Sequence, residues 1–308
     1  MTIQHIKKIN GPYKLMVLVF SLLGIIFSFW ELIARPFAHN FNKGLAYFSL
    51  NTWLESHDLL DFFLVGYASF YLVILAIIAV QFTFRYLTLS EPSLAKKFGG
   101  CYVIIWLSYL VLSGAIYGGA LYFFCSPDKF SDEYMRQVIY DSYNLTITHI
   151  PRFLVIPYAD DDSIRWPNLY FLLIGVLNLG LQYFIIIFCG VRTNTILKHN
   201  LRRLSIENRR LQKQIFKALV IQTIVPTFLF VLPIAPFLIG PLLDTTMNFP
   251  TGWMYVILCL YPPIDTIVYM LIVSEYKRVT LMMLKPFLPK RIKISTDTSM
   301  STPAAIAK

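Results

Sequence analysis

Six long apolar stretches, separated by polar segments, dominate the pattern of hydrophobic and polar positions along the chain. The hydrocarbon core of a bilayer is about 30 Å thick and needs about 20 helical residues, so each stretch is predicted to be a membrane-spanning helix. We therefore expect an all-α fold, a polytopic transmembrane helical bundle over residues 1–278 with a cytoplasmic tail at 279–308. The six predicted spans cover residues 15–34, 60–83, 100–124, 168–190, 218–240 and 252–274.

The composition agrees with a membrane protein. Of the 308 residues, 56% are hydrophobic and 14% are charged, and the mean hydropathy is +0.60. Because soluble proteins are about 25% charged, these values exclude an ordinary soluble domain, and they also exclude a disordered chain. Within the six stretches the formally charged residues are Glu31, Asp61 and Asp265, and only Asp265 lies deep.

Lysine and arginine are distributed unevenly between the connecting segments. Alternate segments, beginning with residues 1–14, hold 21 of the 27 basic residues, and the other segments hold 6. Because basic residues collect on the cytoplasmic side, we expect a multi-pass plasma-membrane protein with both termini inside the cell. The net charge of +10 is attributed to these cytoplasmic segments, so we expect no nucleic-acid partner. The segment 125–167 is then external, and its Asn144-Leu145-Thr146 predicts N-glycosylation at Asn144.

The sequence offers little for chemistry inside a membrane. All five histidines lie outside the apolar stretches, and neither His-Glu-x-x-His nor Gly-x-Ser-x-Gly occurs. Intramembrane metalloproteases, haem proteins and serine proteases need imidazoles at depth, so we expect no enzymatic activity, no metal site and no cofactor. A membrane transporter stays open as an alternative, although the internal repeats typical of transporters are not visible. The four cysteines are expected to be free thiols: Cys101, Cys125, Cys189 and Cys259.

Two basic features lie at the expected cytoplasmic side. Phe84-Arg85-Tyr86 ends the second apolar stretch, and Arg85 there is either a switch residue packed under the bundle or an arginine that snorkels to the interface. The segment before the fifth stretch is rich in basic residues, which suit either an acidic partner surface or anionic lipid. These basic residues are Arg202, Arg203, Arg209, Arg210 and Lys213.

Prolines mark weak points in the last two apolar stretches. Pro262 and Pro263 remove backbone hydrogen bonds next to Asp265, an intramembrane acid and therefore a candidate functional residue. The alternative is a structural kink in which a neutral Asp265 hydrogen-bonds to Gln222 or Asn178. Pro226 gives the fifth stretch a point at which the helix can bend and swing its inner end.

Taken together, these motifs resemble the nematode seven-transmembrane serpentine chemoreceptors of the str (class r) type. The similar residues are Gly11, Tyr13, Lys14, Met16, Pro36, His39, Arg85, Tyr86, Leu87, Gln214, Phe216, Ala218, Leu219, Gln222, Pro226, Tyr261, Pro262, Asp265 and Tyr276. The mild departures are Thr266, where the family usually has proline, and Lys277, where it usually has arginine. The large departure is the count of six predicted spans rather than seven, from which we expect the family's first helix to be absent.

The resemblance implies a rhodopsin-like receptor that binds a small environmental molecule in the outer half of its bundle and signals to a heterotrimeric G protein, in a sensory cilium. It implies that Arg85, Tyr86 and the basic cluster face the G protein. It also implies that a helix switch involves Pro226, Gln222, Pro262, Pro263 and Asp265. A truncated, non-signalling receptor remnant stays open as an alternative, because a missing helix uncovers faces that its neighbours would cover.

Overall fold

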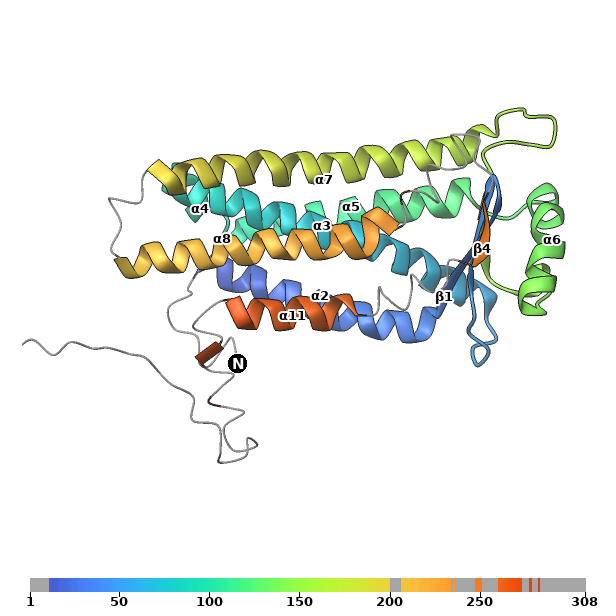
Figure 1. The fold of residues 1–308 in the computed structure, drawn as a ribbon, viewed down its shortest axis with the longest axis horizontal. Coiled ribbons are helices and arrows are strands. Elements are labelled where there is room, and N and C mark those ends of the chain that lie inside the picture. Colours follow the sequence, from blue (N-terminus) through green and yellow to red (C-terminus); the bar gives the residue numbers. More distant parts are fainter. Residues whose placement is uncertain are drawn as a thin grey trace, which may run out of the picture.

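The computed structural model describes residues 11–199, 206–233, 235, 247–250, 260–272, 277–278 and 282. Long helices run side by side along the molecule, and a small sheet closes one end of them (Figure 1). We call that end the sheet end and the opposite end, where α3 finishes, the Arg85 end. The elements are α2 (Pro12–Ala34), β1 (Pro36–Asn42), β2 (Gly44–Ser49), α3 (His57–Ser90), α4 (Pro92–Lys96), η1 (Gly100–Tyr102), α5 (Val103–Phe124), α6 (Lys129–Tyr143), η2 (Ile147–His149), β3 (Arg152–Val155), α7 (Trp166–His199), α8 (Ile206–Pro226), the π-helical turn η4 (Thr227–Val231), β4 (Met247–Pro250) and α11 (Tyr261–Ile272).

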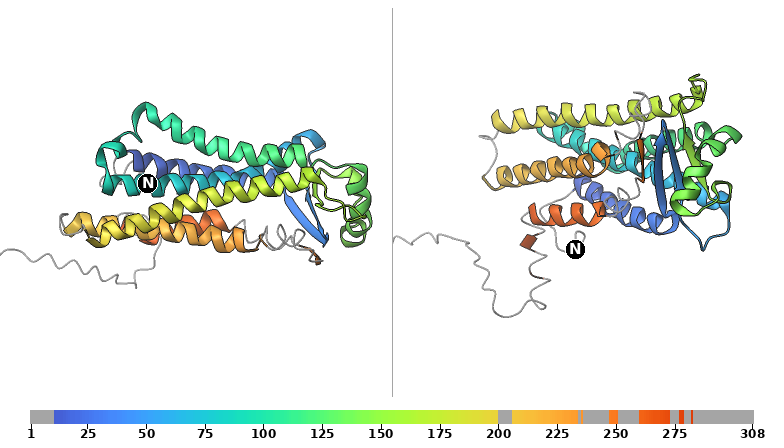
Figure 2. Two further views of the ribbon diagram at one scale, coloured as in Figure 1. Left: turned by 90° about the horizontal axis from the view of Figure 1, so that it is seen from above. Right: turned by 45° about the vertical axis from the view of Figure 1, so that its right-hand side comes forward.

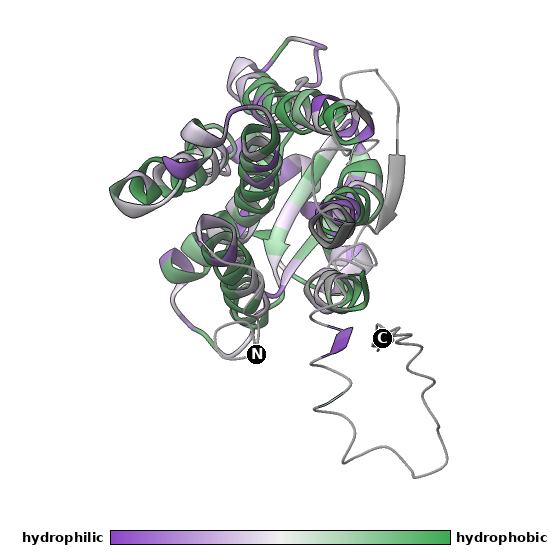
Figure 3. Ribbon diagram, turned by 90° about the vertical axis from the view of Figure 1, so that its left-hand side faces the viewer, coloured by the Kyte–Doolittle hydropathy of each residue, from purple (hydrophilic) through white to green (hydrophobic). Residues whose placement is uncertain are grey.

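The predicted transmembrane helical bundle is confirmed. Within the described residues, four helical segments are long and apolar enough to cross a membrane: Pro12–Ala34, His57–Ser90, Gly100–Phe124 and Trp166–Lys198. Apolar residues cover their outward faces as well as their inward ones (Figure 3), and Ile25, Phe29 and Phe184 are each more than half exposed. Such a belt is costly in water and favourable in lipid. The predictions for 218–240 and 252–274 fall partly outside the described residues.

Helix α3 is the central element of the bundle. In its most apolar stretch 56% of the residues are buried, against 17% in α2 and 22% in α7. It packs against α2, α5, α7 and α8, and its residues enter three apolar clusters of the bundle. A helix surrounded on all sides has no polar face, which explains why its sequence is apolar almost throughout.

A four-stranded antiparallel sheet at the sheet end was not predicted. Its strand order is β3-β2-β1-β4, so it joins connecting segments that are far apart in the chain. One face packs on the bundle through Ala38, Tyr47 and Phe153, and the other packs against α6 through Phe48 and Leu154. Helix α6 lies across the outside of the sheet in every view (Figure 2). The sheet and α6 therefore form a cap on the bundle.

Polar contacts fix α6 in this cap. Asp128 accepts a hydrogen bond from the backbone N–H of Ser131 (2.8 Å), while the Ser131 hydroxyl accepts one from the N–H of Asp128 (2.9 Å), which makes a capping box. Arg152 donates to both carboxylate oxygens of Asp132 at 2.7 Å. Tyr143, at the other end of α6, hydrogen-bonds to Nδ1 of buried His39 (2.8 Å), and burial raises the pKa of this tyrosine to about 12.

The N-terminal capping residue of α6, Asp128, gives a first prediction. Partial burial tends to raise the pKa of Asp128, but hydrogen bonds from Ser131 and the ion pair with Arg165 outweigh it, and the pKa lies below its ordinary value of 3.8. The charged carboxylate therefore stabilises α6 fully above pH 3.8, and this contribution is lost as the pH falls through the lowered pKa. Asp128→Ala should cost about 1 kcal/mol, seen as about fivefold faster hydrogen exchange of the α6 amides.

The matched control is Glu133→Ala, which removes an exposed carboxylate of α6 that pairs with Arg136 but caps nothing. We expect exchange in α6 to change by less than about twofold in this variant, since exposed ion pairs contribute little. Equal exchange rates in Asp128→Ala and the unchanged protein at neutral pH would contradict the assigned role of Asp128.

Candidate functional site

Arg85 ties three helices together at the Arg85 end of the bundle. Its side chain is only 4% exposed, and its Nη1 donates a hydrogen bond to Oε1 of Gln212 on α8 at 2.7 Å. The guanidinium carbon lies 4.3 Å from the ring centre of Tyr13 on α2, which is a cation–π contact. A residue of α3 thereby contacts the first turn of α2 and the second turn of α8.

The charge of Arg85 is poorly compensated in this position. Its Nε is buried without a hydrogen-bond partner, and within the described part of the chain Arg85 makes no ion pair. Burying a charge away from water is unfavourable unless hydrogen bonds and an opposite charge replace the lost solvation. Among the described residues, the Gln212 amide and the Tyr13 ring therefore compensate the buried charge in part.

The other residues predicted to face the G protein are distributed differently. Tyr86 is half-buried, and its ring lies 6.3 Å from that of Phe188 on α7. Lys213 is exposed on α8. Arg209 and Arg210 belong to α8, but their side chains lie outside the described residues, as do Arg202 and Arg203 altogether. The structure thus brings Arg85 and the start of α8 together.

Sequence reasoning missed the two partners of Arg85. Tyr13 was noted as part of the family resemblance, without a role. Gln212 is separated from Arg85 by 127 positions. It lies among basic residues, and the prediction assigned the contact with a partner to those residues. A neutral amide opposite an arginine leaves no charge pattern in the sequence, so the only signal was its place on the same helix as Gln222 and Pro226.

Helix α8 changes its geometry at the predicted bending point. It ends at Pro226, which has no N–H to direct toward the carbonyl of Gln222, and the chain continues as the π-helical turn Thr227–Val231. Gln222 itself is 2% exposed. Interruptions of this kind are places where a helix bends, so the segment before Pro226 can pivot relative to the segment after it.

A side-chain contact fixes the position of that pivot. The hydroxyl of Thr227 donates to the carbonyl of Thr223 (2.7 Å) and lies 2.7 Å from the hydroxyl of Tyr183 on α7. Because the single proton of Thr227 is used within α8, Tyr183 must be the donor in the second bond. Helix α8 is therefore attached to α7 beside the bend and to Arg85 near its beginning.

The predicted proline–aspartate segment opens α11. This helix begins at Tyr261, which is 2% exposed, so Pro262 and Pro263 occupy its first turn, where a missing N–H removes no hydrogen bond from the helix. The side chains of Pro262 and Asp265 lie outside the described residues. Asn178, one of the suggested partners of Asp265, instead donates to the carbonyl of Ser113 (2.9 Å).

That contact belongs to a polar layer between α5 and α7. Ser113, Asn178 and Gln182 are joined by hydrogen bonds of 3.0–3.3 Å, and Tyr109 donates to Oε1 of Gln182 at 2.6 Å. Inside a membrane, satisfied polar pairs of this kind hold neighbouring helices together. We therefore assign these four residues to helix packing.

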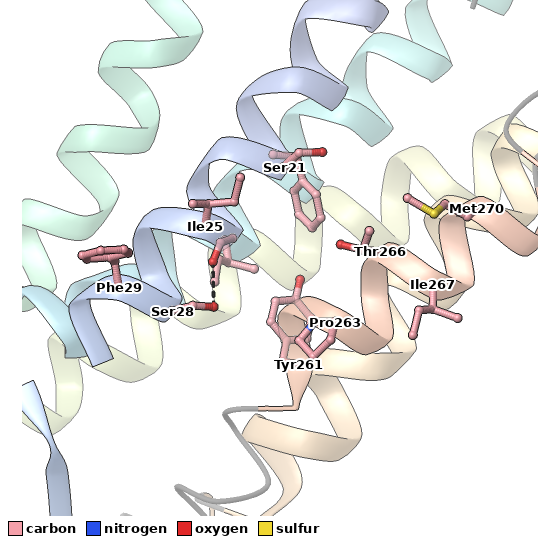
Figure 4. A pocket seen from close by; sticks show the side chains of 12 residues that line it. Ser21, Ile25, Ser28, Phe29, Tyr261, Pro263, Thr266, Ile267 and Met270 are labelled. Atoms are coloured by element: carbon pink, nitrogen blue, oxygen red, sulfur yellow. Dashed lines mark hydrogen bonds between the residues drawn. The ribbon is translucent and has the colours of Figure 1, made fainter. Parts of the chain in front are cut away.

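A groove of 510 Å³ lies between α2 and α11 (Figure 4). Ser21, Ile25 and Ser28 line it from α2, while Pro263 and Thr266 line it from α11. Both serine hydroxyls donate to carbonyls of their own helix, at 3.0 Å and 3.1 Å. These small side chains therefore do not project from α2 into the groove. Small residues on such a face allow another helix to approach closely.

The sequon and the thiols are placed as follows. Asn144 is exposed at the C-terminus of α6, in a left-handed conformation (φ 55°) that asparagine adopts readily. Cys101 is exposed, and Cys125 and Cys189 are buried free thiols. Within the described ranges no group of three His, Cys, Asp or Glu side chains is placed to hold a metal ion.

Comparison with known proteins gives consistent matches over nearly the whole chain. The sequence profile of the family described as serpentine type 7TM GPCR chemoreceptor Str matches residues 1–281. The G-protein coupled receptor str-33 of Caenorhabditis elegans is 36% identical over 285 residues, which are 90% of this chain and 82% of that protein. Serpentine receptor class r-10 of the same organism is 25% identical over 273 residues, 87% of this chain and 80% of its own. The predicted resemblance is confirmed.

Proposed function

Because this chain belongs to the serpentine 7TM GPCR chemoreceptor family Str, whose members are multi-pass membrane receptors, we propose that it is an odorant-type chemosensory receptor. In this proposal it binds a small environmental molecule, activates a heterotrimeric G protein and has no enzymatic activity. The Arg85 end faces the cytoplasm and the sheet end faces outward, in the plasma membrane of a sensory cilium. The C-terminus is cytoplasmic.

The contact between Arg85 and Gln212 is the single observation that carries the proposal. It joins α3 to the beginning of α8, while the bend at Pro226 and the attachment of Thr227 to Tyr183 lie farther along the same helix. Breaking this hydrogen bond loosens the inner end of α8, where the remaining contacts with α3 are apolar, through side chains such as Ile215 and Ala218. The opening that a movement of this end leaves, with Arg85 at its centre, is where a G protein binds in our proposal.

The ligand is proposed to bind in the outer half of the bundle, beneath the cap. Aromatic rings gather there around Phe27, whose ring centre lies 5.0 Å from that of Tyr67 and 5.8 Å from that of Tyr71. The hydroxyl of Tyr67 donates to a carboxylate oxygen of Glu31 (3.3 Å). Phe27 and Tyr67 are fully buried, so in our proposal a small, mostly apolar molecule with one hydrogen-bonding group enters by displacing these rings.

A modest difference in ligand affinity is enough to drive the change. A hydrogen bond to a charged group contributes about 1.5–3 kcal/mol, so loss of the Arg85–Gln212 contact lowers the opening free energy by that order. A ligand shifts the equilibrium only by its differential affinity for the two arrangements, and a few kcal/mol suffice.

The Arg85 contact gives two predictions of opposite sign. Gln212→Ala removes the acceptor and should raise ligand-independent G-protein activation by about tenfold. Gln212→Glu replaces the neutral amide by a carboxylate that pairs with Arg85, and it should lower the same activity below that of the unchanged receptor. The measurement is nucleotide exchange on a purified heterotrimeric G protein by the receptor in nanodiscs. Equal rates for the two variants would contradict the proposed latch.

Arg85→Ala should abolish G-protein activation while leaving surface expression intact, because the residue that meets the G protein is lost. Lys96→Ala is the matched control, since Lys96 is an exposed basic residue at the same end, in α4. Full activation by Arg85→Ala would refute the role of Arg85. An unchanged chain that reaches the surface but never activates a G protein would favour the alternative of a non-signalling receptor remnant.

The orientation is tested at Asn144. Expressed in animal cells, the chain should carry an N-linked glycan that is lost in Thr146→Ala and kept in Thr146→Ser, because both hydroxyl residues complete the sequon. The readout is the change in gel mobility after glycosidase treatment. A chain that is inserted in the membrane but has no glycan in either form would contradict an external sheet end.

The groove between α2 and α11 is a surface on which a further helix could pack. The family is described as seven-spanning, while we predict six spans in this sequence. A further membrane-spanning helix would fit against the small residues that line the groove, and it would cover apolar side chains such as Ile25 and Phe29. We propose that the family's first helix occupies this place when it is present.

A further inference from the structure

A second groove, of 450 Å³, lies between α7 and α8 in the half of the bundle nearer the Arg85 end. Ile187 and Val191 line it from α7, and Phe216 and Val220 line it from α8. Its floor is the ring of Phe82 on α3, which comes so near to Gly190 that a Cβ there would lie 3.2 Å from it. The groove is open toward the surrounding lipid, and its lining is almost wholly apolar.

The groove reaches through only part of the membrane. On each helix its lining spans nine residues, Ile186 to Asn194 and Phe216 to Ile224, which correspond to about 12 Å of helix. Toward the sheet end, the hydrogen bond between Tyr183 and Thr227 holds the two helices together. A transmembrane helix, which needs the full thickness of the bilayer, does not fit a groove that is closed halfway. A molecule confined to one leaflet does.

Basic residues continue the two walls beyond the open end of the groove. Lys198 follows Val191 and Asn194 on the same side of α7, and Lys213 precedes Phe216 and Val220 on the same side of α8. Both lysines are exposed, and each lies about one helical turn beyond the last lining residue of its helix. An apolar groove with cations at its polar end matches a lipid with an anionic headgroup.

We propose that this groove binds one anionic phospholipid of the cytoplasmic leaflet, with an acyl chain between α7 and α8 and its headgroup between Lys198 and Lys213. The leaflet rests on the orientation proposed above, but the lipid site itself does not depend on signalling. The hydroxyl of Thr223 does not need a hydrogen-bond acceptor from the lipid, because it donates to the carbonyl of Leu219 (3.0 Å). Asn194, exposed at the rim, lies where the glycerol ester groups would pass.

The test is native mass spectrometry of the full chain, reconstituted with phosphatidylserine and phosphatidylcholine that carry identical acyl chains. We expect one phosphatidylserine to stay bound through detergent washing, at least about tenfold more often than phosphatidylcholine. Val191→Trp fills the groove and should remove this adduct. The matched control is Val176→Trp on the same helix, because Val176 is 56% exposed, like Val191 at 61%, and does not line the groove.

A second pair of variants tests the headgroup contact. Lys198→Gln with Lys213→Gln should reduce the phosphatidylserine adduct at least about tenfold, whereas Lys96→Gln with Lys97→Gln, also exposed at the Arg85 end, should leave it unchanged. This comparison of the two lysine pairs tests the lipid site even where Val191→Trp fails to fold. Equal retention of the two lipids, or a phosphatidylserine adduct that survives both Val191→Trp and the loss of the two lysines, overturns the proposal. Because no G protein is present, the result is independent of the proposed signalling.

Discussion

The packing of α3 against every other long helix makes Arg85 the contact on which the arrangement of the bundle depends. In lipid, apolar side chains gain little by leaving one apolar surface for another, so polar contacts and close packing decide how helices associate. Most polar contacts seen between helices have satisfied partners, as in the layer of Ser113, Asn178 and Gln182. Arg85 is a buried charged residue whose Nε has no hydrogen-bond partner in the described part of the chain, so its burial costs free energy.

The two ends of the molecule differ in how firmly they are held. At the sheet end, strands from three separate connections pair, and Arg152 holds Asp132 through two hydrogen bonds of 2.7 Å. At the Arg85 end, α8 is joined to α3 by the amide of Gln212 and by apolar contacts such as that between Phe216 and Phe82, and it is separated from α7 by a lipid-facing groove. In the proposed mechanism, a perturbation beneath the cap is therefore relieved by movement at the opposite end.

The sequence predicted the helices well because a membrane requires about 20 apolar residues in a row, a signal that needs no knowledge of tertiary structure. The sheet could not be predicted in the same way. Its strands have four to seven residues, and β2 pairs with β3, more than a hundred positions away. Arg85 was identified from its place at the end of a span, whereas Gln212 was not, because a neutral partner on a distant helix leaves no pattern in the chain.

The neutrality of Gln212 has a functional meaning in the proposed mechanism. A buried carboxylate opposite Arg85 would form an ion pair, and separating such a pair leaves an uncompensated charge at a cost of about 3–5 kcal/mol. An amide holds the same guanidinium by a hydrogen bond of about 1.5–3 kcal/mol. A small apolar ligand makes few polar contacts, so its differential affinity is limited. A closed state held by Gln212 therefore lies within the range that such a ligand can overcome.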